Sequence, residues 1–168
     1  MPLLSTRWLA SAPVKYGRQS VGRSVRVWFD LDTGQGLGLF VTVGSKTKLL
    51  PRTDIHLTDS TLSIVNKDVL QTLNKPARAE KVSRLSRHVI GATVETVDGR
   101  RVGVLRDILL TDYDWRIAQL VVQDKSGERL LSRHIIVALA DDVVTVQNDV
   151  LNIQIAPWLS PANFELLH

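Results

Sequence analysis

The side chains best suited to chemistry in this sequence are basic, and they gather in three short stretches. These stretches lie within residues 18–26, 46–52 and 78–87. Closely spaced Lys and Arg side chains can follow the phosphates of a nucleic acid, because each contact releases a condensed counterion. Single-stranded RNA would also need exposed aromatic rings for base stacking, for which the candidates are Trp8, Tyr16, Trp28 and Trp115. The candidate interaction surface comprises Arg18, Arg23, Arg26, Trp28, Lys46, Lys48, Arg52, Arg78, Lys81 and Arg84.

The same residues have a simpler interpretation, in which the charges are solvated and the tryptophan belongs to a core. Trp28 stands between Val27 and Phe29 in a sequence typical of a strand. Because side chains alternate between the faces of a strand, at least one of these three must point outward. Both interpretations therefore stay open at this stage.

The remaining patterns lack the spacing that catalysis or metal binding requires. His56, His88, His134 and His168 form no i, i+4 pair and have no glutamate at metal-site spacing. The sequence Asp30-x-Asp32-x-Gly34 begins like a calcium loop, but the acid expected near the twelfth position is missing. There is no cysteine, and no serine lies in a nucleophile elbow. We therefore predict a non-enzymatic protein with neither metal nor other cofactor.

The net charge of +4 is distributed unevenly along the 168 residues. Residues 1–74 hold nine Lys/Arg against five Asp/Glu, and residues 75–84 hold four against one. Residues 85–151 hold eight Lys/Arg against ten Asp/Glu. Such asymmetry favours an acidic partner for the first half, although charge drift between duplicated copies explains it equally well.

A repeat organises the chain, because shifting the sequence by 81 positions superposes its first half on its second without a gap. The matching residues include a glycine, apolar pairs and a proline over most of the chain, which indicates two copies of one domain. Among the matches are Val21-Gly22 with Val102-Gly103, Leu49-Leu50 with Leu130-Leu131, Asp68-Val69-Leu70 with Asp149-Val150-Leu151, and Pro76 with Pro157.

Apolar residues alternate with polar or small ones in both halves, as in half-buried strands. Leu37, Leu39, Val41 and Val43 show this period most clearly, and Asp98-Gly99 is a strong hairpin-turn signal. We therefore predict an all-β protein. The expected divisions are a first domain over 1–74, a basic linker over 75–84, a second domain over 85–151 and an apolar tail over 152–168.

The tail holds more apolar residues than a solvated end needs. Ser160-Pro161 indicates the start of a short helix, with a serine cap and a proline at the first position. We expect the tail to dock on the protein's own core or, as the alternative, on a partner through Trp158, Phe164 and Leu167. No signal peptide and no apolar run of membrane-spanning length is evident, so a cytoplasmic protein is expected, with a peripheral place at a membrane left open.

The second copy resembles the PRC-barrel domain family, which is named for the photosynthetic reaction centre H subunit. A similar barrel forms the C-terminal domain of RimM-type ribosome maturation proteins. The resemblance covers nearly all of the second copy and, through the repeat, most of the first. It rests on Leu85-Ser86, Ile90-Gly91, Val94, Asp98-Gly99-Arg100, Val102-Gly103, Asp107-Ile108, Leu120-Val121-Val122, Leu130-Leu131 and Val143-Val144-Thr145-Val146.

This resemblance implies two tandem small β-barrels, followed here by the short helical tail. It also implies an interaction module that acts as an adaptor in the assembly of a larger complex, with another protein as partner. The alternatives are an RNA- or ribosome-associated maturation factor that uses the basic first half, and a peripheral subunit or assembly factor of a photosynthetic membrane complex. Whether the two barrels pack against each other as a pseudo-dimer stays open at this stage.

Overall fold

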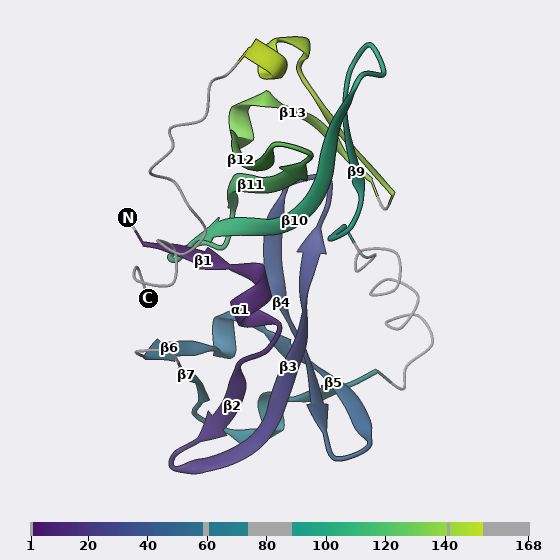
Figure 1. The fold of residues 1–168 in the computed structure, drawn as a ribbon. Helices are drawn as coiled ribbons and strands as arrows, with labels where there is room; N and C mark the ends of the chain where they lie inside the picture. Colours follow the sequence, from purple (N-terminus) through teal and green to yellow (C-terminus); the bar gives the residue numbers. More distant parts are fainter. Residues whose placement is uncertain (1, 59–60, 74–88, 141, 153–168) are drawn as a thin grey trace. The chain divides into compact units, whose positions relative to one another are not determined.

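The computed structural model describes residues 2–58, 61–73, 89–140 and 142–152. Strands dominate this part of the chain and form two sheets, joined by short helical turns of at most five residues (Figure 1). The all-β prediction is confirmed. Neither sheet closes on itself within the described residues. No helix in these segments is long and apolar enough to cross a membrane.

The first sheet has the strand order β6-β7-β2-β3-β4-β5-β8. Its neighbours are antiparallel except for β2 and β7, which run parallel. The helix α1 (Thr6–Leu9) precedes it, and the 3-10 turns η1 (Arg52–Asp54) and η2 (Lys67–Val69) interrupt it. Its strands are β2 (Pro13–Tyr16), β3 (Gln19–Asp30), β4 (Gln35–Val43), β5 (Lys46–Pro51), β6 (His56–Thr58), β7 (Thr61–Ile64) and β8 (Gln71–Thr72).

The second sheet has the order β12-β11-β10-β9-β14-β13, and β1 pairs with β10 as well. Here β9 and β14 form the parallel pair. The 3-10 turns are η3 (Arg133–Ile135) and η4 (Asn148–Asn152). The strands are β1 (Leu3–Ser5), β9 (Thr93–Thr96), β10 (Arg101–Thr111), β11 (Ile117–Asp124), β12 (Gly127–Ser132), β13 (Ile136–Leu139) and β14 (Val143–Val146).

The two sheets have the same strand order. The strands β6, β7, β2, β3, β4 and β5 of the first sheet correspond in turn to β13, β14, β9, β10, β11 and β12 of the second. Even their irregularities coincide. The register between β3 and β4 shifts between Ser24 and Arg26, and the register between β10 and β11 shifts between Leu105 and Asp107, the positions that the repeat makes equivalent. Bulges that skip one residue of a strand are specific features of a fold. Their recurrence at equivalent positions therefore supports the sequence repeat.

The repeat contains small length changes that the gapless superposition missed. Val14 on β2 and Val94 on β9 occupy equivalent places in the parallel pairs, but their separation is one position shorter than the repeat offset. Their parallel partners, Leu62 and Val144, are separated by one position more than this offset. The gapless superposition is thus correct only for the central strands β3–β5 and β10–β12. The second copy has gained one residue in the β9–β10 turn and another within β13, where the register shifts between Ile136 and Ala138.

Both cores are built from the central strands. Val27, Leu39 and Leu50 lie side by side across β3, β4 and β5, and all three are buried. Ile108, Leu120 and Leu131 form the equivalent row in the second sheet and are also buried. Each such side chain contributes about 1.5–3 kcal/mol through removal from water. These two rows therefore mark equivalent core positions in the two sheets.

The described residues divide into two compact units. One unit contains residues 6–30, 35–58 and 61–73 and carries the first sheet; the other carries the second sheet and contains residues 89–140 and 142–152. Two segments from the first half, 2–5 and 31–34, also belong to the second unit. The predicted linker 75–84 and the predicted tail beyond Asn152 lie outside the described residues.

Candidate binding surfaces

The predicted basic residues of the first unit are divided between the two faces of its sheet. Arg23 and Arg26 lie opposite Thr42 and Phe40, which share one face of β4. Lys46 and Lys48 lie opposite residues 43 and 41, which share the other face. Arg18 is exposed in the β2–β3 turn and Arg52 is half-buried in η1. Arg78, Lys81, Arg84, Trp158, Phe164 and Leu167 lie outside the described residues.

Arg26 and Trp28 take part in packing. The Arg26 guanidinium lies 4.5 Å from the centre of the Phe40 ring, and burial lowers the pKa of Arg26. Trp28 packs against buried Phe40 and Leu49, together with Leu73. The Trp28 indole nitrogen is enclosed and has no hydrogen-bond partner among the described residues. These contacts favour a structural role for both side chains over a free platform for base stacking.

A groove in the second unit was not evident from the sequence. It runs along β13, the last strand in the order of the second sheet, and no described strand pairs with the outer edge of β13. Its cavity volume is about 350 Å³, and all four residues of β13 line it. We call this feature the β13 groove. Its lining is Leu31, Asp32, Thr33, Gly34, Arg116, Ile117, Arg133, Ile136, Val137, Ala138 and Leu139.

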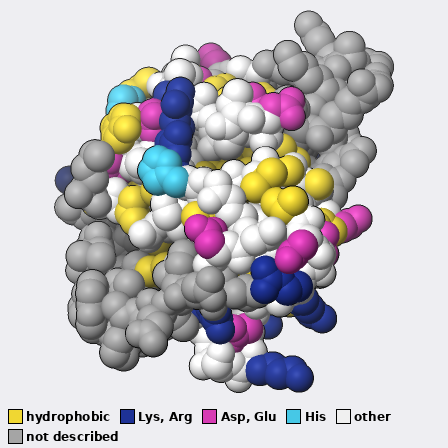
Figure 2. Space-filling view, turned by 90° about the horizontal axis from the view of Figure 1, so that it is seen from above, with side chains coloured by type: hydrophobic (Ala, Val, Ile, Leu, Met, Phe, Trp, Pro, Cys, Tyr) yellow, Lys and Arg dark blue, Asp and Glu magenta, His cyan; other side chains and the backbone are white. Residues whose placement is uncertain are grey.

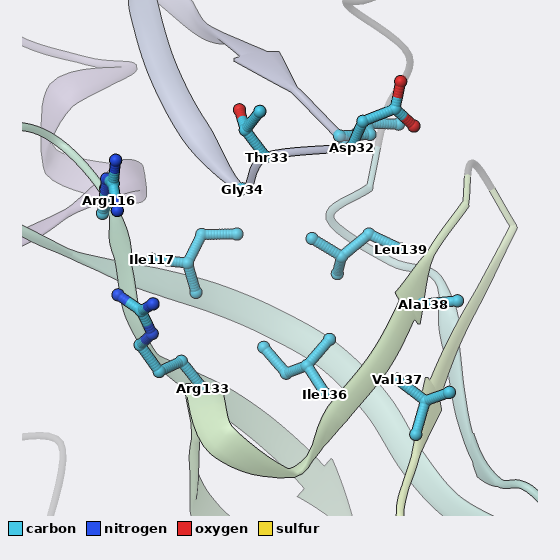
Figure 3. A pocket seen from close by; sticks show the side chains of 11 residues that line it. Asp32, Thr33, Gly34, Arg116, Ile117, Arg133, Ile136, Val137, Ala138 and Leu139 are labelled. Carbon is cyan, nitrogen blue, oxygen red and sulfur yellow. The ribbon is translucent and has the colours of Figure 1, made fainter.

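The interior of the β13 groove is apolar and its rim is charged. Ile117, Ile136 and Leu139 point toward one another into the hollow (Figure 3). Arg116 and Arg133 lie at one side of the hollow in this view, and Asp32 lies at the other with its carboxylate turned away. Arg116 pairs with Asp114 over 3.3 Å. Arg133 is exposed and makes no ion pair with any described residue.

The loop 31–34 is held against β11 by its backbone. The amide of Ile117 donates a hydrogen bond of 2.9 Å to the carbonyl oxygen of Gly34. Gly34 has a φ of +66°, a conformation that glycine adopts at little cost. The apparent calcium-like spacing around this glycine therefore belongs to the turn that closes one side of the groove.

Among the described residues, no three histidine, aspartate or glutamate side chains come together as metal ligands. One face of the molecule shows basic and acidic side chains interspersed, with hydrophobic ones in small groups (Figure 2). A free strand edge beside an apolar hollow is the arrangement that extended peptides use when they add to a sheet.

No family model matches the chain, and no curated protein matches it significantly in sequence.

Proposed function

We propose that this chain is a non-enzymatic adaptor that binds another protein in the assembly of a larger complex. We further infer that each unit is a copy of a small PRC-type barrel. The shared strand order, with one parallel pair in each sheet and bulges at equivalent positions, supports a duplicated domain of this kind.

The observation that carries the proposal is the edge of β13 that no described strand pairs with, beside the β13 groove. An unpaired edge strand presents backbone donors and acceptors that another chain can satisfy. An extended segment added there would bring alternate side chains toward the sheet, where Ile117, Ile136 and Leu139 form an apolar socket. Main-chain bonds then supply affinity and the socket supplies specificity.

The rim predicts the chemistry of the partner. Arg133 forms no ion pair with any described residue, so an acidic side chain next to the inserted apolar one would gain a charge-assisted hydrogen bond. The partner segment is therefore expected to be extended, with one medium-sized apolar residue close to an Asp or Glu. Arg116 contributes less, because Asp114 already pairs with it.

Selection of a peptide library on the full chain tests this proposal. We expect the enriched peptides to share an apolar residue beside an acidic one. On binding, NMR amide shifts should concentrate at Ile117 and at residues 136–139. Charge reversal at the rim, Arg133→Glu, should weaken binding by about tenfold, whereas Arg18→Glu in an exposed turn of the other unit should not. Peptides whose shifts map elsewhere, or binding that is insensitive to Arg133→Glu and Leu139→Ala alike, would reject the β13 groove as the docking site.

A further inference from the structure

A second hollow in the same unit is lined by four basic side chains. It lies over the start of β10 and the β11–β12 hairpin, and its cavity volume is about 790 Å³. We call it the cationic hollow. Its basic residues are Arg101, Arg106, Lys125 and Arg129, Asp124 is its one acidic residue, and Val102, Gly103, Val104, Gln123 and Ser126 complete the lining.

The single carboxylate of the hollow already has partners within the protein. Asp124 pairs with Arg129 over 2.7 Å and accepts hydrogen bonds of 2.6 Å from the amide and the hydroxyl of Ser126. The Ser126 bonds, with a smaller contribution from Arg129, lower the pKa of Asp124, so it is ionised at neutral pH. Arg101, Arg106 and Lys125 are exposed and form no ion pair with any described residue. Three cations thus line this hollow without an ion-pair partner in the described part of the chain.

The β10 bulge directs one of these cations outward. The register passes from Leu105 opposite Val122 to Asp107 opposite Val121, which leaves Arg106 without a cross-strand partner. Bulges re-aim the extra side chain in this way. Arg101, near the start of the same strand, lies opposite Glu95 on β9, and Glu95 does not line the hollow.

The first unit shows that the fold does not need these charges. At the positions that the repeat makes equivalent to Arg101, Arg106 and Lys125, it has Ser20, Val25 and Gly44. The bulge at Val25 forms nevertheless, and the surrounding strands keep the same register. Of the four cations, only Arg129 has a basic counterpart, which is Lys48. The cationic hollow is therefore a feature of the second unit alone, added to a scaffold that folds without it.

We propose that the cationic hollow binds a compact ligand with clustered phosphate groups, such as a polyphosphate. Three unpaired cations match a ligand with several negative charges better than a single phosphate. The volume lies within the range of about 300–1,000 Å³ that small-ligand sites occupy. No aromatic side chain lines the hollow, so it lacks the stacking surface that single-stranded nucleic acid uses.

Titration calorimetry of the full chain with tripolyphosphate, at low and at moderate salt, tests the proposal. The variant Arg101→Ser/Arg106→Val carries the residues of the first unit and should lower tripolyphosphate affinity by about tenfold or more. Arg106→Gln should lower it in the same direction, which keeps the test valid if the double variant folds poorly. The control Arg18→Ser/Lys46→Ser removes two exposed charges from the other unit and should change affinity less than about twofold.

Three results would overturn the proposal. One is the absence of measurable tripolyphosphate binding at low salt. Another is an equal loss of affinity in the control variant, which would indicate attraction to net charge alone. The third is binding of a single-stranded oligonucleotide that requires Arg101 and Arg106 when tripolyphosphate does not bind, which would identify a nucleic-acid surface.

Discussion

Ser5 donates a hydrogen bond of 2.5 Å to a carboxylate oxygen of Asp107, although 102 positions separate the two residues. Asp107 is buried, and its other carboxylate oxygen accepts the backbone amide of Ile108 at 2.8 Å. The strand β1 runs antiparallel to β10 at this point, with Ser5 opposite Leu109. The first residues of the chain thus complete the second sheet, and a buried carboxylate depends partly on them.

The substitution Ser5→Ala should therefore destabilise the protein. Removal of a donor from a buried carboxylate costs about 1–3 kcal/mol, because the buried oxygen then has neither this hydrogen bond nor one to water. Urea unfolding at neutral pH measures the loss. The matched control is Ser11→Ala, since the exposed Ser11 hydroxyl bonds to the nearby carbonyl of Trp8 at 3.1 Å and to no buried group. Equal effects of the two substitutions would show that the Ser5 bond adds nothing specific.

A glycine allows a close approach of two strands at equivalent positions of the two sheets. A Cβ at Gly103 would lie 2.4 Å from the carbonyl oxygen of Gln123, and one at Gly22 would lie 2.6 Å from that of Thr42. Both contacts involve backbone, which cannot move aside cheaply. Gly103→Ala and Gly22→Ala should each lower the free energy of unfolding by about 1–3 kcal/mol. Arg101→Ala, exposed on the same strand as Gly103, should change it by less than about 0.5 kcal/mol. A Gly103→Ala protein as stable as wild type would contradict this close approach.

Local patterns predicted the strands well. The alternation of Leu37, Leu39, Val41 and Val43 indicated β4, because period two is a direct consequence of strand geometry. The Asp98-Gly99 signal also marked a true turn, in which Gly99 has a φ of +82°. The repeat correctly linked the central strands of the two sheets. It missed the single-residue additions, because these fall in a turn and at a bulge, where the regular apolar alternation is interrupted.

The candidate binding surfaces were harder to predict because they depend on bulges and on distant segments. Arg23 and Arg26 lie three positions apart, and a regular strand would place them on opposite faces. The skipped residue between Ser24 and Arg26 brings them to one face. The β13 groove combines the loop 31–34 with β11 and β13. This loop connects β3 and β4 of the first sheet, and no local sequence pattern indicates that it belongs to the second unit.

Removal of the Arg26 side chain tests its structural role. Arg26→Gln loses the cation–π contact with Phe40 and part of the cover over the Phe40–Leu49 cluster. We expect a loss of about 1 kcal/mol in the free energy of unfolding. Lys46→Gln, which changes an exposed residue of the same sheet, should have little effect. The reverse order of the two effects would count against packing as the function of Arg26.

The β9–β10 turn should make a specific contribution to stability at low pH. The Thr96 hydroxyl, followed by Arg100, lowers the pKa of Asp98 below its usual value of 3.8. Arg100 contacts this carboxylate over 2.9 Å. Because the folded state binds the proton more weakly than the unfolded state, the ionised Asp98 stabilises the protein above about pH 4. This contribution is lost as the pH falls through the folded-state pKa.

Thr96→Val removes the main donor to Asp98 while preserving the shape of a buried side chain. It should raise the pKa of Asp98, lower stability at neutral pH and flatten the fall in stability between about pH 4 and pH 2. Carboxyl-detected NMR titration reads the pKa directly, and urea unfolding across this pH range reads the stability. Asp98→Asn should also flatten the fall in stability over this pH range, since it removes the titrating group. If the fall in stability between about pH 4 and pH 2 is unchanged in both variants, Asp98 has the same pKa in the folded and unfolded chains.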